Sequence, residues 1–478
     1  MANLLDLPNE TLSRVAACLS DVDHEALFSL IYVNKRLNGI ATPFLVRRWP
    51  PVEIEALEHS PRYYRFAEHL LRNPSVRRYV KLLEVGDFST RQDRDIIEIL
   101  VSQDELQQVA TAGLREWPLL AELTEWREQI LEGIPDASVV LILLLARDLV
   151  EFDFTVPLVG SIEEDGGEQL TLGFISQMAR KFSSNPDDAL LNQLPLARLQ
   201  SVKYKHWDTQ LGVPGKYAAP FFHLPNLRTF YGFRVEIPSL RELESSEDDN
   251  DGQSTYLTKF PVGTSAVEEI VLNTSDVCLE AVATLVGACR RLTTFALHYG
   301  PVLDTEEVDS SALAELLLAR ADSLQNLALD WGDSPTLKIT AQGPLKIEQC
   351  FHKLRRLEHL QLPLSMLCED SEIDGQTFLS FNSQLLPKSL RCLCLVGDWQ
   401  WRFNNEVVRN KMVDSIEAFV LKCGPGGEFL HLEALELIHL THRSSQDEYA
   451  QRLKETGRRQ NVRVTFNKLQ WLTWPECA

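Results

Sequence analysis

The chain has 478 residues, of which 44% are hydrophobic, and its formal net charge is −21. That apolar content is ordinary for a folded protein and excludes a disordered polypeptide. The acidic balance argues against a general phosphate-binding role, because nucleic-acid binders need basic patches.

Cysteine usage and the N-terminal sequence predict a protein of a reducing compartment. The 9 cysteines are spread along the chain without a disulfide-like spacing. Residues 1–6 lack the basic start of a signal peptide. The longest apolar run, residues 139–146, is far shorter than the roughly 20 residues that a membrane span needs. We therefore expect a protein of the cytoplasm, the nucleus or both, with no membrane or nucleic-acid partner.

The first fifty residues carry the pattern of three short helices. The sequence Leu-Pro-Asn-Glu at residues 7–10 predicts a helix with Pro8 at its first position, where proline sacrifices no hydrogen bond. Apolar residues then recur at helical spacing over residues 12–19, 26–33 and 37–45. Three helices of this length bury little surface on their own, so the remaining apolar surface predicts a docking face.

These residues resemble the F-box motif over positions 4–48. The pattern Leu-x-Leu-Pro-Asn-Glu-x-Leu starts at Leu5, and Ala-Leu-x-x-Leu-x-x-Val-x-Lys-Arg-Leu starts at Ala26. Members of that family bind the S-phase-kinase-associated adaptor of SCF ubiquitin ligases, and through it a cullin. The chain has Leu37 where many members have Trp. The resemblance implies that a module of residues 1–50 contacts the adaptor through Leu7, Pro8, Leu12, Val15, Leu27, Leu30 and Val33.

The next segment, residues 51–148, is mostly helical in pattern and fits no repeat. We interpret it as a helical linker and N-terminal cap, with a first strand at Val80-x-x-Leu83-x-Val85.

From residue 149 to 478 the pattern Leu-x-x-Leu-x-Leu recurs. Its clear copies start at Leu324, Leu357, Leu390 and Leu432, and conservative variants start at Val267 and Leu292. The intervening lengths suit one strand and one crossover helix per repeat, which predicts parallel neighbouring strands. The region resembles the leucine-rich-repeat family, although its spacing is irregular. The resemblance implies an α/β fold, an irregular solenoid with parallel strands on the concave face and helices outside. The acidic, Gly- and Ser-containing segments near 161–168 and 244–253 are predicted to be loops inserted in it.

Alternation along each strand points the motif leucines inward and the residues between them outward. Aligned by motif, the outward residues form three rows across the strands, starting at Glu269, Val271 and Asn273. This mixed polar surface predicts a target-binding face, with a partner on loops or helices as the alternative. The candidate contacts are Thr294, His298, Asn326, Asp330, His359, Gln361, Cys392, Cys394 and Glu436.

The sequence carries no recognisable catalytic motif. It has no Walker loop, no Gly-x-Ser-x-Gly, no His-Glu-x-x-His and no Cys-x-x-Cys. The rows bring His359, Cys392, Cys394 and Glu436 together, all possible zinc ligands, but alternate residues on a strand diverge rather than converge. We therefore expect no catalytic residue, cofactor or metal.

These observations favour a substrate receptor of an SCF-type ubiquitin ligase that does no chemistry itself. The alternative is a leucine-rich-repeat interaction scaffold with no ligase role. An enzyme with an unrecognised site is the weakest interpretation.

Overall fold

A computed structural model gives the fold of the protein. It describes residues 4–50, 62–86, 101–123, 125–156, 169–184, 189–206, 212–237, 257–300, 307–309, 311–330, 338–340, 347–373, 376–397, 406–438 and 448–466. The protein divides into two compact units, Met1–Phe230 with Ser246–Pro261, and Tyr231–Ser245 with Val262–Ala478. The acidic loops predicted near 161–168 and 244–253 lie outside the described residues. The domain boundaries predicted at residues 50 and 148 stay predictions.

The first unit begins with three short helices, α1 (Asn9–Val22), α2 (His24–Val33) and α3 (Lys35–Ala41). The side chain of Asp23 accepts a hydrogen bond from the amide of Ala26 and caps α2, and Asn34 caps α3 in the same way. Helix α1 starts one residue later than predicted, so Pro8 is its N-cap residue. The predicted apolar positions form the core of these helices: Leu12, Ala16, Leu27, Leu30, Leu37 and Ala41.

The rest of the first unit combines helices with parallel strands. Strands β1 (Arg48–Trp49), β2 (Leu82–Val85), β3 (Glu151–Val156) and β4 (Ser201–His206) pair in that order, all parallel. The strand predicted at residues 80–85 is therefore confirmed. The helices are α4 (Arg62–Arg72), α6 (Gln103–Glu116), α7 (Trp126–Leu131), α8 (Pro135–Leu145), α10 (Leu170–Ser184) and α11 (Ala219–Phe222).

The second unit holds a longer parallel sheet. Its strands β7 (Val235–Ile237), β8 (Glu269–Val277), β9 (Thr294–Tyr299), β11 (Asn326–Asp330), β13 (His359–Pro363), β16 (Cys392–Val396), β17 (Ala434–Ile438) and β18 (Arg463–Thr465) pair in that order. Strand β6 (Thr229–Phe233) contains the boundary between the units. The four clear copies of Leu-x-x-Leu-x-Leu and the two conservative variants thus form the predicted parallel neighbours, and the fold is a mixed α/β fold.

The pairing register also confirms two of the predicted rows. One set of residues, called the first row, pairs directly from strand to strand: Glu269, Thr294, Asn326, His359, Cys392 and Ala434. The second row contains Val271, Ala296, Ala328, Gln361, Cys394 and Glu436. An irregularity between Leu272 and Ser275 shifts the pairing of β8 with β9, so the third row loses its register at Asn273.

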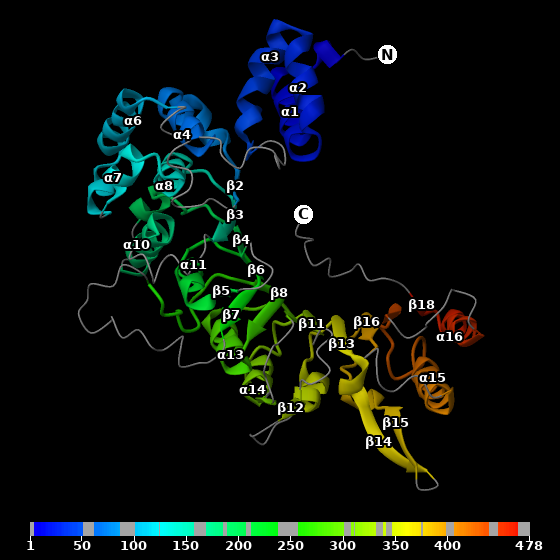
Figure 1. Cartoon of the computed structure of the whole chain (residues 1–478). Coiled ribbons are helices and arrows are strands. Elements are labelled where there is room, and N and C mark those ends of the chain that lie inside the picture. Colours follow the sequence, from blue (N-terminus) through cyan, green and yellow to red (C-terminus); the bar gives the residue numbers. More distant parts are fainter. Residues whose placement is uncertain are drawn as a thin grey trace. The chain divides into compact units, whose positions relative to one another are not determined.

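The motif leucines of this sheet are fully buried, among them Leu327, Leu360, Leu393 and Leu435. Figure 1 shows helices along one side of these strands, with α13 (Leu279–Ala288) and α14 (Ser311–Ala319) followed by α15 (Glu406–Val420) and α16 (Glu448–Arg459). Burial of the leucines between sheet and helices supplies the main stabilising free energy of the unit.

Three features of the second unit differ from the sequence prediction or were missed. The segment predicted as a short helix at 347–355 is a 3₁₀ helix, η8 (Ile347–Lys353). An antiparallel pair, β14 (Cys368–Ile373) with β15 (Gln376–Phe381), and a parallel pair, β10 (Glu307–Asp309) with β12 (Lys338–Thr340), were not predicted. Within the described ranges, every helix is too short or too polar to cross a lipid bilayer.

Candidate functional site

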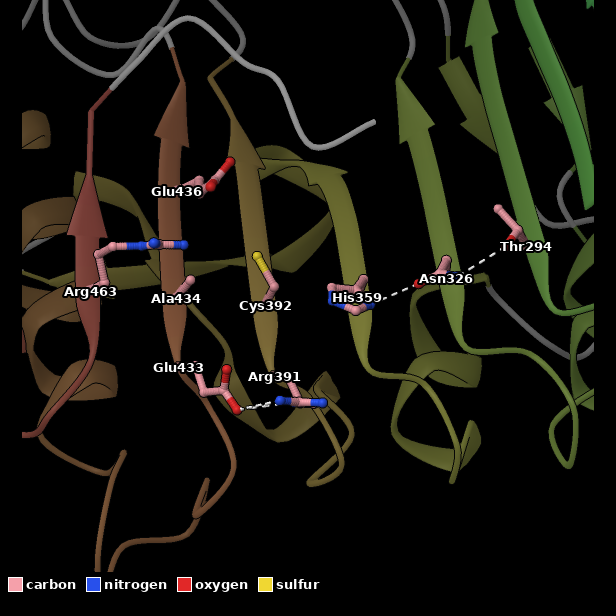
Figure 2. Close-up of a pocket in the computed structure, with 9 residues that line it drawn as sticks. All are labelled: Thr294, Asn326, His359, Arg391, Cys392, Glu433, Ala434, Glu436 and Arg463. Carbon is pink, nitrogen blue, oxygen red and sulfur yellow. Dashed lines mark hydrogen bonds and ion pairs between the residues drawn. The ribbon is translucent and has the colours of Figure 1, made fainter. Parts of the chain in front are cut away.

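A cavity of about 530 Å³ opens over the first row of the second unit. Figure 2 shows its lining on strands β9, β11, β13, β16, β17 and β18. The lining residues are Thr294, Asn326, His359, Arg391, Cys392, Glu433, Ala434, Glu436 and Arg463. Five of them are predicted target contacts: Thr294, Asn326, His359, Cys392 and Glu436.

Hydrogen bonds join three neighbouring side chains of the first row. The Nδ2 atom of Asn326 donates to Oγ1 of Thr294 at 2.9 Å, and Nδ1 of His359 lies 2.7 Å from Oδ1 of Asn326. Burial lowers the pKa of His359 below its usual value, and the nearby Arg391 adds to this effect, while Glu358 and Glu433 oppose it. The ring is therefore neutral at pH 7, with its proton on Nδ1.

Charged groups frame the cavity at two places. The guanidinium of Arg391 donates through Nη2 to Oε1 of Glu433 at 2.7 Å, and its Nη1 atom lies 3.8 Å from Glu358. Arg463, on the last described strand, extends across Ala434 into the opening (Figure 2). Because Arg391 is held by two carboxylates, Arg463 is the cation of the lining that is better placed to meet a ligand.

Small residues between His359 and Arg463 leave the space for the cavity. Cys392 and Ala434 occupy the two intervening strands of the first row. Burial, together with the nearby Glu436 and Glu433, raises the pKa of Cys392 to about 12, so the thiol is neutral. In the part of the protein that the structure describes, no three His, Cys, Asp or Glu side chains converge as a metal site.

The second row corrects the prediction of an exposed face. Its side chains lie on the predicted side of the strands, but Gln361 and Cys394 are fully buried, as are Ala296 and Ala328. Strands about 4.8 Å apart leave short side chains such as those of Ala328 and Cys394 little access to water. Gln361 is longer than both of these neighbours, so strand spacing does not explain its burial. Neither the Nε2 nor the Oε1 atom of Gln361 has a hydrogen-bond partner within the described ranges. Such an unpaired buried amide is rare and costs free energy.

The two remaining predicted contacts, His298 and Asp330, lie in the third row and do not line the cavity. The Nδ1 atom of His298 lies 2.9 Å from Oδ1 of Asn273, whose Nδ2 atom donates to the hydroxyl of Tyr231 at 3.1 Å. These contacts repeat the hydroxyl, amide and imidazole order of the first row on β6, β8 and β9.

The predicted adaptor contacts in the N-terminal helices differ in solvent exposure. Leu12, Leu27 and Leu30 belong to the buried core, whereas Leu7 and Val15 are half-buried. Pro8 and Val33 are exposed. Four further exposed apolar residues were missed: Leu4, Val22, Phe28 and Tyr32, which are 42%, 85%, 38% and 82% exposed. Their role in adaptor binding stays a prediction.

Sequence reasoning also missed Arg391, Glu433 and Arg463. A signal for Arg463 was present in the sequence, because Val462 and Val464 alternate with it as they would on a strand. In the structure Arg463 pairs with Ala434 and continues the first row. Arg391 and Glu433 lie one position before that row, where the motif predicts no function.

Comparison with known proteins adds no assignment: no protein-family model matches the sequence, and no curated protein matches it.

Proposed function

We propose that the protein is a substrate-receptor subunit of an SCF-type ubiquitin ligase. The observation that carries this proposal is the exposed apolar surface of the N-terminal helices. Tyr32 and Val33 are 82% and 62% exposed at the end of α2, and Pro8 is exposed at the start of α1. Exposed apolar side chains on so small a helical core favour a partner that covers them.

The local structure supports a fixed docking surface. The guanidinium of Arg36 donates to the carbonyl of Leu7 at 2.7 Å and to Oδ1 of Asn9 at 3.0 Å. These bonds tie the Leu7–Pro8 segment to α3, so the segment keeps one conformation before a partner arrives. Pre-ordering of this kind lowers the entropy that binding must overcome.

The resemblance of residues 4–48 to the F-box motif supports the SCF adaptor as that partner. The cavity of the second unit then supplies the surface for a target. The receptor does no chemistry in this mechanism. It holds the target near a charged ubiquitin donor, so that transfer becomes effectively intramolecular.

Co-expression of the full-length protein with the adaptor and a cullin tests the proposal. We expect a stable complex that elutes as one species in size-exclusion chromatography. A folded full-length protein that never co-elutes with the adaptor would reject the ligase role and leave the interaction scaffold.

A further inference from the structure

Two residues of the cavity lining carry opposite charges without an ion-pair partner in the described part of the protein. Arg391 is held by Glu433 and Glu358, whereas Glu436 and Arg463 form no hydrogen bond or ion pair with any described residue. A charged side chain that lines a cavity and lacks a partner is suited to bind an opposite charge on a ligand.

The two charges lie on neighbouring strands, one step apart along the sheet. Arg463 pairs with Ala434, and Glu436 lies two residues beyond Ala434 on the same face of β17. Figure 2 shows the guanidinium of Arg463 lying across β17 beside Ala434, and the carboxylate of Glu436 farther along that strand, directed toward β16. The charge of Arg463 therefore opposes the rise in the pKa of Glu436, but the two groups are too far apart for a direct ion pair.

Partial burial makes Glu436 the stronger of the two attractions for a ligand. Burial is the main cause of the raised pKa of its carboxyl group, because partial removal of water disfavours the charged form. A cation placed beside this carboxylate interacts with it more strongly than it would in open water. Arg463 is exposed, so its guanidinium can rotate toward an anion elsewhere on the same ligand.

The placement of these charges selects a ligand that carries both signs. A phosphate or another polyanion would meet Arg463 but would also approach Glu436 and Glu433. A polyamine would meet Glu436 but would also approach Arg463 and Arg391. An ammonium and a carboxylate on one small molecule satisfy both groups, since two charge-assisted hydrogen bonds of about 2.8 Å bridge a gap that is too wide for a direct ion pair.

The rest of the cavity lining is uncharged. Cys392 and Ala434 form the floor beside the two charges, and burial keeps the thiol neutral. The hydrogen-bonded chain of Thr294, Asn326 and His359 forms a polar side. The volume of about 530 Å³ lies within the range of small-molecule sites, about 300–1,000 Å³. This lining suits a small zwitterion whose side chain carries no charge.

We propose that the cavity binds a small zwitterion, an amino acid with an uncharged side chain, between Glu436 and Arg463. The ammonium group donates to the carboxylate of Glu436, and the carboxylate of the ligand accepts from the guanidinium of Arg463. The inference goes beyond the proposed function, because a receptor needs a surface for its target, whereas this site needs a ligand small enough to enter the cavity. It holds with or without the ligase role, since every residue that it uses lies in the second unit.

Isothermal titration calorimetry of the purified full-length protein tests the inference. The probes are the common L-amino acids, β-alanine and γ-aminobutyrate, each titrated alone. Dipeptides of Lys and Glu, acetylated and amidated at their ends, carry the same two charges on side chains and represent a target segment. We expect at least one free amino acid with an uncharged side chain to bind. Its analogues without the amino group or without the carboxylate should bind at least about tenfold more weakly, because each lacks one charge-assisted hydrogen bond.

Two variants assign the charges of the ligand to their partners. Glu436→Gln should bind the amino acid and its deaminated analogue with equal affinity, because the variant lacks the carboxylate that pairs with the ammonium group. Arg463→Gln should likewise lose the preference over the decarboxylated amine. The matched controls are Glu448→Gln and Arg458→Gln, at exposed positions on α16, which should keep both preferences of the parent. Circular dichroism checks that each variant is folded, and if one is not, the ligand analogues alone decide the test.

Three results would overturn the inference: no binding by any free amino acid, equal binding by the analogues that lack one charge, or preferences that survive in folded Glu436→Gln and Arg463→Gln. Binding by the blocked dipeptides alone would also overturn it, and would assign the two charges to side chains of a target.

Discussion

His359 and Asn326 face each other on neighbouring parallel strands, with Nδ1 of the imidazole 2.7 Å from Oδ1 of the amide. Since Nδ2 of Asn326 donates to Thr294, its Oδ1 atom is the acceptor, and the imidazole donates through Nδ1. The contact therefore fixes both the amide orientation and the tautomer of the ring at the centre of the cavity.

The lowered pKa of His359 predicts a pH dependence of stability. The unfolded protein takes up a proton as the pH falls through 6.5, whereas the folded protein resists this until a lower pH. Stability that is complete above pH 6.5 should thus decrease as the pH falls toward the folded pKa of His359. Urea denaturation at pH 7.5 and 5.5 should show a smaller loss for His359→Gln than for the parent. Equal losses would mean that His359 is not held neutral by its surroundings.

Gln361→Met should stabilise the second unit by about 1–3 kcal/mol, because it removes a buried amide with no partner in the described structure. The free energy of unfolding, measured by chemical denaturation, checks this. Gln451→Met, at an exposed position, should change it by less than about 0.5 kcal/mol. A clear destabilisation by Gln361→Met would show that the amide has an internal partner.

Replacement of Leu360 by Asp should unfold the second unit. The leucine is fully buried on β13, and an unpaired charge there costs about 3–5 kcal/mol or more. Arg356→Asp, four residues earlier at an exposed position, is the matched control and should leave the protein soluble with normal circular dichroism. Equal tolerance of both substitutions would contradict the strand register.

Loss of the exposed and half-buried apolar residues of the N-terminal helices should weaken adaptor binding. Each aliphatic anchor contributes about 1.5–3 kcal/mol when buried, so Leu7→Ala with Pro8→Ala should weaken binding about tenfold to a few-hundredfold or more. Tyr32→Ser with Val33→Ser should act similarly and leave the fold intact, since both side chains are exposed.

Biolayer interferometry against the adaptor measures these changes. Val262→Ser, at an exposed apolar position of the second unit, provides the control. If the folded double variants bind as tightly as the parent, the N-terminal helices are not the docking surface.

The strands and their register were predictable because one short motif repeats. Leu327, Leu360 and Leu393 recur at the same motif position, and alternation then assigns every neighbour to a face. The cavity was predictable only in part. Membership of a face does not give exposure, so the burial of Gln361 could not be inferred from its position. The pairing of Arg391 with Glu433 depends on side-chain rotamers that no periodicity encodes.

The local elements that differed have physical reasons as well. Residues 347–353 have helical spacing but only two turns' length, which suits a 3₁₀ helix. Strand β14 contains Glu369, Asp370 and Glu372, residues that are depleted in strands, so its residues carry no strand signal. Tertiary pairing with β15 determines its conformation.

The position of Arg463 on β18 links ligand binding to fraying of the sheet. In a stack where each strand pairs only with its neighbours, opening proceeds from an end at the smallest free-energy cost. Strand β18 has three residues and is the last strand of this sheet in the described part of the protein. A ligand that contacts both Arg463 and residues of the inner strands therefore stabilises the pairing of β18 with β17. Binding of such a ligand should slow hydrogen exchange at the amides of β18 first. Loss of the pairing between β18 and β17 should in turn release the ligand.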